Sequence, residues 1–178
     1  MEIMLRDVVA TDASALAHVL ITANDHAFRG RVPDQCLEFS ETESAANWQR
    51  TLSEGLPDKD FMIAAQALTG EMVGYAWGGP NTSDTVYAGE LRQLSVLPAY
   101  QKRGIGRRLV CEVVHRLVEK SMGTMRVEVL HVNPNRAFYE RLGGVYLSDH
   151  PYDWDGVKLT MCVYGWTDTS VFLREQCQ

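Results

Sequence analysis

The sequence predicts a mixed α/β domain whose central sheet is antiparallel in part. Three observations support this fold class. Helical and strand periodicities alternate along the chain, turn residues separate short apolar runs, and 178 residues suffice for one domain with a sizeable core. The expected order is a strand, two helices, three strands, a helix, a strand, a helix and two strands. Because three strands follow one another without a helix, we exclude a doubly wound parallel sheet and expect a single domain over residues 1–178.

The first third of the chain supplies one strand, two helices and a hairpin. A short strand at residues 3–5 precedes a helix over residues 11–27, whose apolar residues recur at helical spacing. A second helix is expected from residue 40 or 42 to about residue 53. The apolar runs 61–65 and 72–77 are separated by a Thr-Gly turn, which predicts a β-hairpin.

Residues 87–97 form the most informative strand. A regular pleat places the charged Glu90 and Arg92 on the same face as the apolar Leu94, so neither face is uniformly apolar. A bulge in the middle of the strand would re-aim its second half and reconcile the pattern. Bulges are frequent beside active sites, so this strand is a candidate site element.

The second half of the chain alternates helices and strands. An apolar stripe begins at Ile105 and repeats every four residues to residue 117, which predicts an amphipathic helix with Gly123 as the residue after its C-cap. A strand at residues 125–129 follows. Asn133 and Pro134 are good N-cap and first-turn residues for a short helix that ends near residue 142. The last two strands, near residues 145–147 and 157–165, are expected to flank a loop over residues 149–156.

Composition and charge exclude several classes of protein. The 17 basic and 23 acidic residues give a net charge of −6, which argues against a nucleic-acid partner. No apolar run approaches the roughly 20 residues that span a bilayer, and the first residues lack the pattern of a secretory signal. We therefore expect a soluble, cytoplasmic protein with no membrane partner.

The four cysteines are far apart in the sequence. Cys36, Cys111, Cys162 and Cys177 form no C-x-x-C pair and show no spacing typical of a zinc site. A chain of this length without an export signal does not need disulfides for stability. We therefore expect four reduced thiols and no metal.

A glycine- and arginine-rich segment separates the central strand from the amphipathic helix. Gly104 and Gly106 permit a tight turn, so the first N–H groups of the helix can point together at an anion. Nearby basic residues, Lys102 and Arg103 among them, add to the attraction. The segment predicts a phosphate or pyrophosphate site; the alternative is an ordinary strand-to-helix turn with solvated charges. The sequence contains neither a Walker A loop nor a Rossmann fingerprint.

Two motifs together resemble the GNAT superfamily of acyl-CoA-dependent N-acyltransferases. Residues 94–109, LSVLPAYQKRGIGRRL, are similar to the family's V-x-P strand followed by [QR]-x-x-G-x-[GA]. Residues 133–143, NPNRAFYERLG, are similar to its N-P-x-x-x-F-Y-E-x-L-G helix. Gly144 stands where the family usually has Phe, which removes an apolar anchor without touching the chemistry.

The resemblance implies a fold and an activity. The fold is a mostly antiparallel sheet of about seven strands, flanked by about four helices and splayed between the fourth and fifth strands. The activity is direct transfer of an acetyl group from acetyl-CoA to a primary amine of a small molecule or peptide. The resemblance also suggests a homodimer.

The resemblance further assigns residues to the co-substrate. The central strand would pair with the pantetheine arm, the glycine-rich loop would hold the pyrophosphate through main-chain N–H groups, and Asn133 would hydrogen-bond the pantetheine. A main-chain N–H near the bulge would polarise the thioester carbonyl. The strand and loop residues so assigned are Leu94, Ser95, Val96, Gln101, Lys102, Arg103, Gly104, Ile105 and Gly106.

Two side chains are candidates for the proton transfers. Tyr139 would lie near the thioester sulfur and protonate the departing thiolate, whereas the alternative for Tyr139 is simple packing against the sheet. Glu90 is the candidate general base for the protonated amine, directly or through a water molecule. The alternative for Glu90 is a strand-end carboxylate paired with Arg92.

The acceptor and two other functions stay open at this point. Acceptor pockets in such folds are built from irregular segments, here residues 25–40 and 149–156. Asp25, His26 and the acidic residues of the later segment are candidates for recognition of a cationic substrate. The alternatives to an enzyme are a non-catalytic CoA-binding regulatory module that kept the pyrophosphate loop, and a nucleotide- or phosphate-binding protein.

Overall fold

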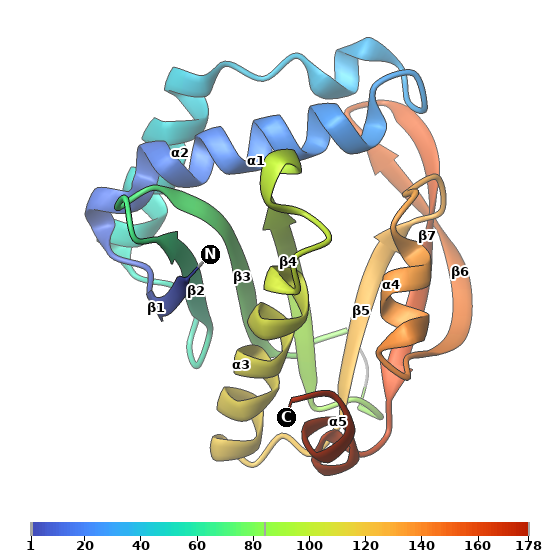
Figure 1. Cartoon of the computed structure of the whole chain (residues 1–178). Helices are drawn as coiled ribbons and strands as arrows, with labels where there is room; N and C mark the ends of the chain where they lie inside the picture. Colours follow the sequence, from blue (N-terminus) through green and yellow to red (C-terminus); the bar gives the residue numbers. More distant parts are fainter. Residues whose placement is uncertain (1, 84, 178) are drawn as a thin grey trace.

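A seven-stranded sheet with the order β1-β2-β3-β4-β5-β7-β6 organises the molecule (Figure 1). This computed structural model describes residues 2–83 and 85–177. Neighbouring strands are antiparallel except β4 and β5, which are parallel, so the predicted mixed and mostly antiparallel sheet is confirmed. The strands are β1 (Ile3–Asp7), β2 (Phe61–Ala67), β3 (Met72–Pro80), β4 (Gly89–Val96), β5 (Met125–Leu130), β6 (Val145–Trp154) and β7 (Val157–Trp166).

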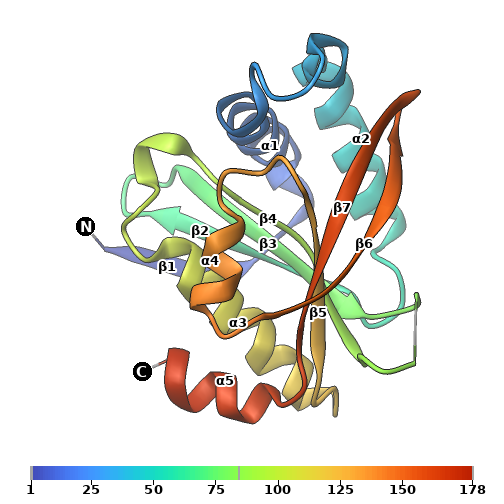
Figure 2. The same ribbon diagram turned by 90° about the vertical axis from the view of Figure 1, so that its right-hand side faces the viewer.

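Helices cover both faces of this sheet. Helices α1 and α2 lie on one face, and α3, α4 and α5 lie on the other (Figure 2). In the described residues, no helix is both long and apolar enough to cross a membrane. The α-helices are α1 (Ala13–Phe28), α2 (Glu41–Glu54), α3 (Ile105–Glu119), α4 (Arg136–Arg141) and α5 (Thr169–Gln176), and short 3₁₀ turns are η1 (Ala10–Asp12), η2 (Asp34–Leu37) and η3 (Pro98–Tyr100).

Each helical layer packs an apolar face on the sheet. The stripe predicted for α3 is fully buried, with Leu109, Val113 and Leu117 at 0% exposure. On the opposite face, Leu16 and Val19 of α1 pack in a second apolar cluster. The two clusters hold β3 and β4 between them, which fixes the central strands from both sides.

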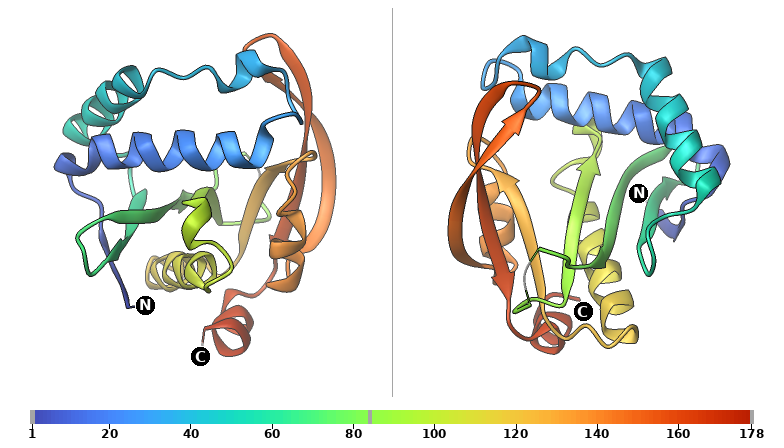
Figure 3. Two further views of the ribbon diagram at one scale, coloured as in Figure 1. Left: turned by 45° about the horizontal axis from the view of Figure 1, so that its top comes forward. Right: turned by 180° about the vertical axis from the view of Figure 1, so that it is seen from behind.

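Strands β4 and β5 splay apart, as the resemblance implied. They pair only over residues 89–91 and 125–127 in the described part of the chain. Beyond Leu91, β4 stays with β3, whereas β5 continues with β7 (Figure 3). The edge of β4 that faces β5 is therefore left without a neighbouring strand over residues 92–96.

The predicted bulge in β4 is confirmed. Trp77 of β3 lies opposite Gln93 and Gly78 lies opposite Leu91, so Arg92 has no opposite residue in the β3–β4 register. The extra residue lets both Leu91 and Leu94 join the apolar cluster on the α3 side. The bulge explains why neither face of a regularly pleated strand would be uniformly apolar.

Two predicted helix ends are wrong. After α3, Ser121 adopts the left-handed conformation (φ 64°), whereas Gly123 has no positive φ. Helix α4 begins at Arg136 rather than Pro134. The Asn133 side chain accepts a hydrogen bond from Asn135 N–H at 2.8 Å, and this turn delays the start of the helix by two residues.

The loop predicted over residues 149–156 is a strand for most of its length. Strand β6 pairs with β7 up to Trp154, and the connection is a tight turn at Asp155 and Gly156. Both turn residues have positive φ, 50° and 86°, as a type I′ hairpin turn requires. Asp153 accepts a hydrogen bond from Gly156 N–H and pairs with Lys158, so its carboxylate serves the turn.

The C-terminal residues form a helix that the sequence analysis did not predict. Helix α5 is capped by Asp168, whose carboxylate accepts hydrogen bonds from the N–H groups of the residues two and three positions later. Cys177, just after α5, forms a disulfide with Cys111 on α3. The prediction of four reduced thiols is therefore wrong for this pair, because α5 brings together two cysteines 66 residues apart in sequence. Cys36 and Cys162 are free thiols.

Candidate active site

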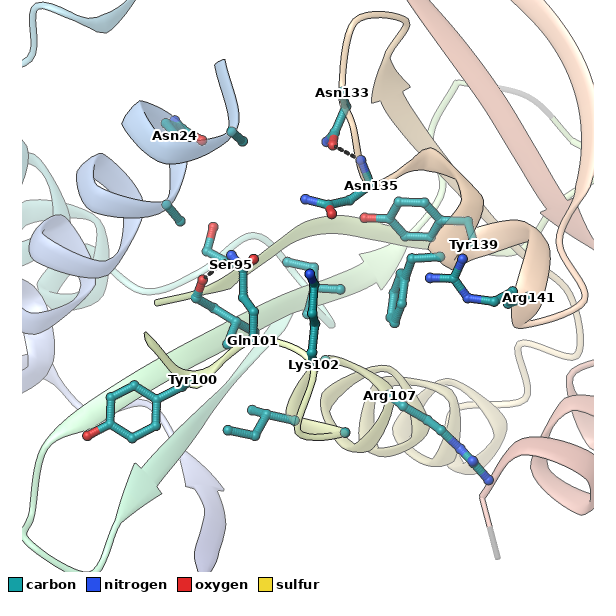
Figure 4. Close-up of a pocket in the computed structure, with 18 of the residues that line it drawn as sticks. Asn24, Ser95, Tyr100, Gln101, Lys102, Arg107, Asn133, Asn135, Tyr139 and Arg141 are labelled. Atoms are coloured by element: carbon teal, nitrogen blue, oxygen red, sulfur yellow. Dashed lines mark hydrogen bonds between the residues drawn. The ribbon is translucent and has the colours of Figure 1, made fainter. Parts of the chain in front are cut away.

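A cavity of about 410 Å³ opens where β4 and β5 separate (Figure 4). Its walls come from four parts of the chain: helix α1, the end of β4, the segment that leads into α3, and the segment that leads into α4. The lining residues are Ala23, Asn24, Ala27, Phe28, Leu94, Ser95, Val96, Tyr100, Gln101, Lys102, Gly104, Ile105, Gly106, Arg107, Asn133, Asn135, Phe138, Tyr139 and Arg141.

The β4 wall presents main-chain groups to the cavity. Residues 94–96 lie beyond the last β4–β5 pair, so their edge toward β5 has no ladder partner in the described residues. The Gln101 side chain donates to Val96 O at 3.0 Å and ties the following loop to the end of β4. Because an extended chain with unpaired N–H and C=O groups favours a partner with amide groups, this edge can take a peptide-like ligand.

The N-terminus of α3 forms the floor of the cavity. Gly104 is the N-cap residue and adopts the left-handed conformation (φ 80°). Because glycine has no side chain, Gly104 does not cap the first N–H groups of the helix. The first backbone hydrogen bond of the helix runs from Arg108 N–H to Gly104 O, which leaves the preceding N–H groups for a ligand. A Cβ on Gly106 would lie 3.4 Å from Phe138, so the protein itself tolerates a methyl group there. Because Gly106 has no side chain, a ligand can approach its main chain closely.

Cationic residues line the cavity near that helix end. Lys102, Arg107 and Arg141 all line the cavity, Arg141 from the opposite wall on α4. Arg103, which was assigned to the co-substrate, does not line it, and its guanidinium lies 5.8 Å from the centre of the Tyr100 ring. Arg107 Nε donates to Gln176 O, and its guanidinium points away from the cavity (Figure 4). Together with the helix dipole, Lys102 and Arg141 make this end of the cavity suited to a multiply charged anion.

Tyr139 reaches the cavity from α4. Tyr139 is 8% exposed, and its ring contacts Phe138 edge-on and stacks on Tyr164. Burial raises the pKa of the Tyr139 hydroxyl well above its usual value, so the phenol is neutral at physiological pH. The hydroxyl has no hydrogen-bond partner in the described residues and points into the cavity (Figure 4). A neutral, unpaired hydroxyl is a suitable proton donor.

Asn133 lies at the rim, in the turn between β5 and α4. Its Oδ1 accepts the Asn135 N–H, so this oxygen is engaged in the turn. Its main-chain N–H donates to Leu130 O at 2.9 Å. The amide NH₂ of Asn133 keeps its two donors for a ligand in the cavity.

Glu90 lies outside the cavity, within a network of charged side chains at the base of the splay. One oxygen accepts a hydrogen bond from Arg92 at 2.7 Å, and the other lies 3.6 Å from Arg126 Nε. Arg92 also bridges to Asp60, with Nε–Oδ2 at 3.0 Å. The alternative interpretation of Glu90, a pair with Arg92, is therefore present in the structure. Four residues of strand separate Glu90 from Leu94, about 13 Å along β4, so a proton transfer by Glu90 needs an intervening water or the acceptor itself.

Most of the cavity wall consists of residues predicted from the sequence. All residues assigned to the co-substrate except Arg103 line the cavity. Ala27 and Phe28 of α1 line the cavity and lie within the segment 25–40 that was expected to build the acceptor pocket. The part of α1 not predicted is Ala23 and Asn24, whereas Asp25 pairs with Arg29 and His26 is exposed. Ala23 and Ala27 form a face of small residues on α1. This pattern could have indicated the wall, because alanines let a helix approach a ligand closely.

The chain is similar to known proteins over the segment that carries β4, α3 and α4 of this cavity. A family model described as "Acetyltransferase (GNAT) domain" matches residues 57–143. A curated relative, "Uncharacterized N-acetyltransferase YuaI" of Bacillus subtilis, is 30% identical over 110 residues, which is 61% of this chain and 64% of that protein. The match therefore spans less than two thirds of that relative's length.

Solved structures share the fold over nearly the whole chain. The PaiA N-acetyltransferase of Thermoplasma acidophilum in complex with coenzyme A is 20% identical and covers 93% of this chain and 100% of its own, with a TM-score of 0.67. YncA of Salmonella typhimurium with acetyl-CoA is 19% identical and covers 94% and 95%, with a TM-score of 0.66. The ribosomal-protein-S5-alanine acetyltransferase of Vibrio fischeri is 16% identical and covers 94% of each chain, with a TM-score of 0.73.

Proposed function

We propose that the chain is an acetyltransferase of the GNAT superfamily and that it transfers the acetyl group of acetyl-CoA directly to a primary amine. The observation that carries the proposal is the coincidence of three features in one cavity. They are the unpaired edge of β4, the uncapped N-terminus of α3 with its cations, and the Tyr139 hydroxyl between them.

The residues of the cavity fit acetyl-CoA. An amide-containing pantetheine arm suits the free edge at residues 94–96, and a pyrophosphate suits the N–H groups that precede Arg108. The bare backbone at Gly106 permits the close approach that such a contact needs. Coenzyme A and acetyl-CoA in the PaiA and YncA structures, which share this fold, support the same assignment.

The chain supplies positioning and a proton. In the reaction the amine nitrogen forms a bond to the acetyl carbon, the carbon–sulfur bond breaks, and the sulfur takes up a proton. We assign that proton to Tyr139, whose neutral hydroxyl faces the cavity. The amine loses a proton in turn, to Glu90 through water or to solvent. Acetyl-CoA bound along β4 would hold the carbonyl in place for attack, which supplies much of the rate enhancement.

The acceptor is proposed to enter from the side opposite α3. The two segments expected to build its pocket meet there, because Trp154 of β6 contacts Phe28 edge-on and stacks on Phe39, at ring centroid distances of 6.2 and 6.3 Å. The aromatic wall favours an amine with an apolar portion. The homodimer and the cytoplasmic location stay predictions.

Thiol release tests this function. The full chain is incubated with acetyl-CoA and a panel of amines, and free CoA is measured with a thiol reagent. We expect release that requires both acetyl-CoA and an amine, and an acetylated product of the amine by mass spectrometry. Tight CoA binding in calorimetry without thiol release across the panel would contradict the proposal and favour the regulatory-module alternative.

A further inference from the structure

A cysteine, a histidine and an aspartate from three elements meet outside the cavity. They are His131, just after β5, Asp149 of β6 and Cys162 of β7, and we call them the Cys162 cluster. One potential ligand atom from each residue lies within 4.8 Å of the other two. None of the three lines the cavity described above, so the proposed acetyl transfer does not account for them.

The sheet fixes the three residues relative to one another. Asp149 and Cys162 are direct cross-strand partners in the β6–β7 register. The His131 N–H donates to Thr160 O at 2.8 Å, which extends the β5–β7 ladder by one residue. The main chain therefore brings the three side chains together whether or not a ligand is bound.

The distances in the Cys162 cluster match a divalent metal site. The Cys162 Sγ lies 3.4 Å from His131 Nδ1, and two ligands of a tetrahedral Zn²⁺ ion at standard bond lengths lie about 3.5 Å apart. Asp149 Oδ2 lies 3.9 Å from the same nitrogen, and a small rotation of this half-exposed side chain closes that gap. Thiolate, imidazole and carboxylate together are the donor set that Zn²⁺ accepts.

The remaining neighbours are compatible with a bound cation. Arg136 donates to Cys162 Sγ at 3.2 Å, which stabilises a thiolate from outside the cluster. The Tyr146 hydroxyl lies beside Asp149. The charges of the Cys162 thiolate, the Asp149 carboxylate and the Arg136 guanidinium sum to −1. A bound dication raises this sum to +1, and Glu140, a carboxylate that interacts with Arg136, lies nearby.

We propose that His131, Asp149 and Cys162 bind a divalent, thiophilic metal ion of the Zn²⁺ type, with a fourth position left for water. The Cys162 thiol gives its proton to solvent as the metal–sulfur bond forms, so charge and protons balance. The bound ion links the β6–β7 hairpin to the turn that carries Asn133. It is a structural link and takes no part in the acetyl transfer.

Cobalt titration tests the metal site. The full chain is titrated with Co²⁺ without reductant, so that Cys111 and Cys177 stay paired and Cys36 and Cys162 supply the free thiols. We expect one equivalent of Co²⁺ to bind with a sulfur-to-cobalt charge-transfer band, and Zn²⁺ to displace it. The matched pair of variants is Cys36→Ser, which keeps the band, and Cys162→Ser, which loses it.

Two further variants keep the test decisive if Cys162→Ser fails to fold. His131→Ala and Asp149→Asn change exposed side chains, and each is expected to weaken Co²⁺ binding at least tenfold while thermal unfolding without metal is unchanged. Absence of the band in the wild-type chain overturns the proposal. So does a band that persists in Cys162→Ser, or unchanged affinity in both His131→Ala and Asp149→Asn.

Discussion

The ring of Tyr139 stacks on the ring of Tyr164, with centroids 6.2 Å apart and an angle of 24° between the planes. Tyr164 uses its own hydroxyl to donate to Glu140 at 3.0 Å, so it is anchored to α4 by two contacts. Tyr139 is held by ring contacts alone, which leaves its hydroxyl for the cavity. The packing role and the chemical role of Tyr139 are therefore carried by different atoms and can be tested separately.

Replacing Tyr139 by phenylalanine removes the hydroxyl and keeps the stacked ring. We expect kcat to fall roughly 10²-fold, the low end for a positioned acid, with little change in thermal stability. Steady-state thiol release and thermal unfolding measure the two effects. Tyr164→Phe is the control, because it removes a hydroxyl that binds Glu140 instead of facing the cavity. Equal turnover in wild type and Tyr139→Phe would exclude the hydroxyl as the proton donor.

Replacing Glu90 by glutamine tests the candidate base. If Glu90 takes the amine proton, activity falls and partly recovers at high pH, where more of the amine is already deprotonated. The measurement is kcat/KM from pH 7 to pH 10 alongside the unfolding free energy. The carboxylate also binds Arg92 and lies beside Arg126, so the variant loses stability as well. A loss of activity that is the same at every pH would assign Glu90 a structural role only.

Arginines on and off the cavity wall provide a matched pair. Arg141→Gln removes a cation that lines the cavity, and we expect the KM for acetyl-CoA to rise about tenfold, the loss of roughly one charge-assisted contact. Arg103→Gln removes a cation of similar exposure that lies over Tyr100, and we expect a change of less than threefold. Steady-state kinetics at fixed ionic strength compares the two. A larger effect at Arg103 would return this residue to the co-substrate site.

The sequence predicted the parts of the site that are local and missed those that depend on tertiary contact. The bulge in β4 and the loop at Gly104 follow from periodicity and glycine placement within a few residues. The α1 wall at Asn24 and the α5 helix depend on packing between distant segments, which no local pattern encodes. The Cys162 cluster was not predicted for the same reason. Its three residues follow no metal-binding spacing in the sequence and meet only through strand register.

Asp12 gives a pH-dependent contribution to stability. Burial alone would raise the pKa of its carboxyl, but hydrogen bonds from Arg6 at 2.7 and 2.8 Å and from Val9 N–H outweigh it and hold the pKa below the usual value. The stabilisation is therefore present above the unfolded pKa of about 3.9 and is lost as pH falls through the folded value. We expect Asp12→Asn to lose about 1–3 kcal/mol at pH 7 in urea unfolding.

The pH series separates charge from shape at Asp12. The difference between wild type and Asp12→Asn is expected to shrink as pH falls from about 4 toward the lowered pKa of folded Asp12, because both side chains are neutral only below that pKa. A difference that stays constant down to pH 3 would show that the charge of Asp12 contributes nothing.

The disulfide between Cys111 and Cys177 makes stability depend on redox state. It closes a loop of 66 residues and ties α5 to α3, so its reduction is expected to lower the unfolding free energy by about 2–4 kcal/mol. Thermal unfolding with and without a reductant measures this. Phe172 of α5 stays 3% exposed through contacts such as that with Trp166, so the helix keeps an apolar anchor when the bond is broken. The expected effect is thus a loss of stability and not of fold.

The double variant Cys111→Ser/Cys177→Ser isolates the bond from other effects of the reductant. It should unfold at the temperature of the reduced wild type and should not respond to reductant, because the remaining cysteines, Cys36 and Cys162, are free thiols in both states. Cys36→Ser is the control and should keep the full reductant response. If the oxidised wild type and the double variant unfold at the same temperature, the bond adds nothing to stability, and contacts of α5 such as Trp166 with Phe172 hold the C-terminus alone.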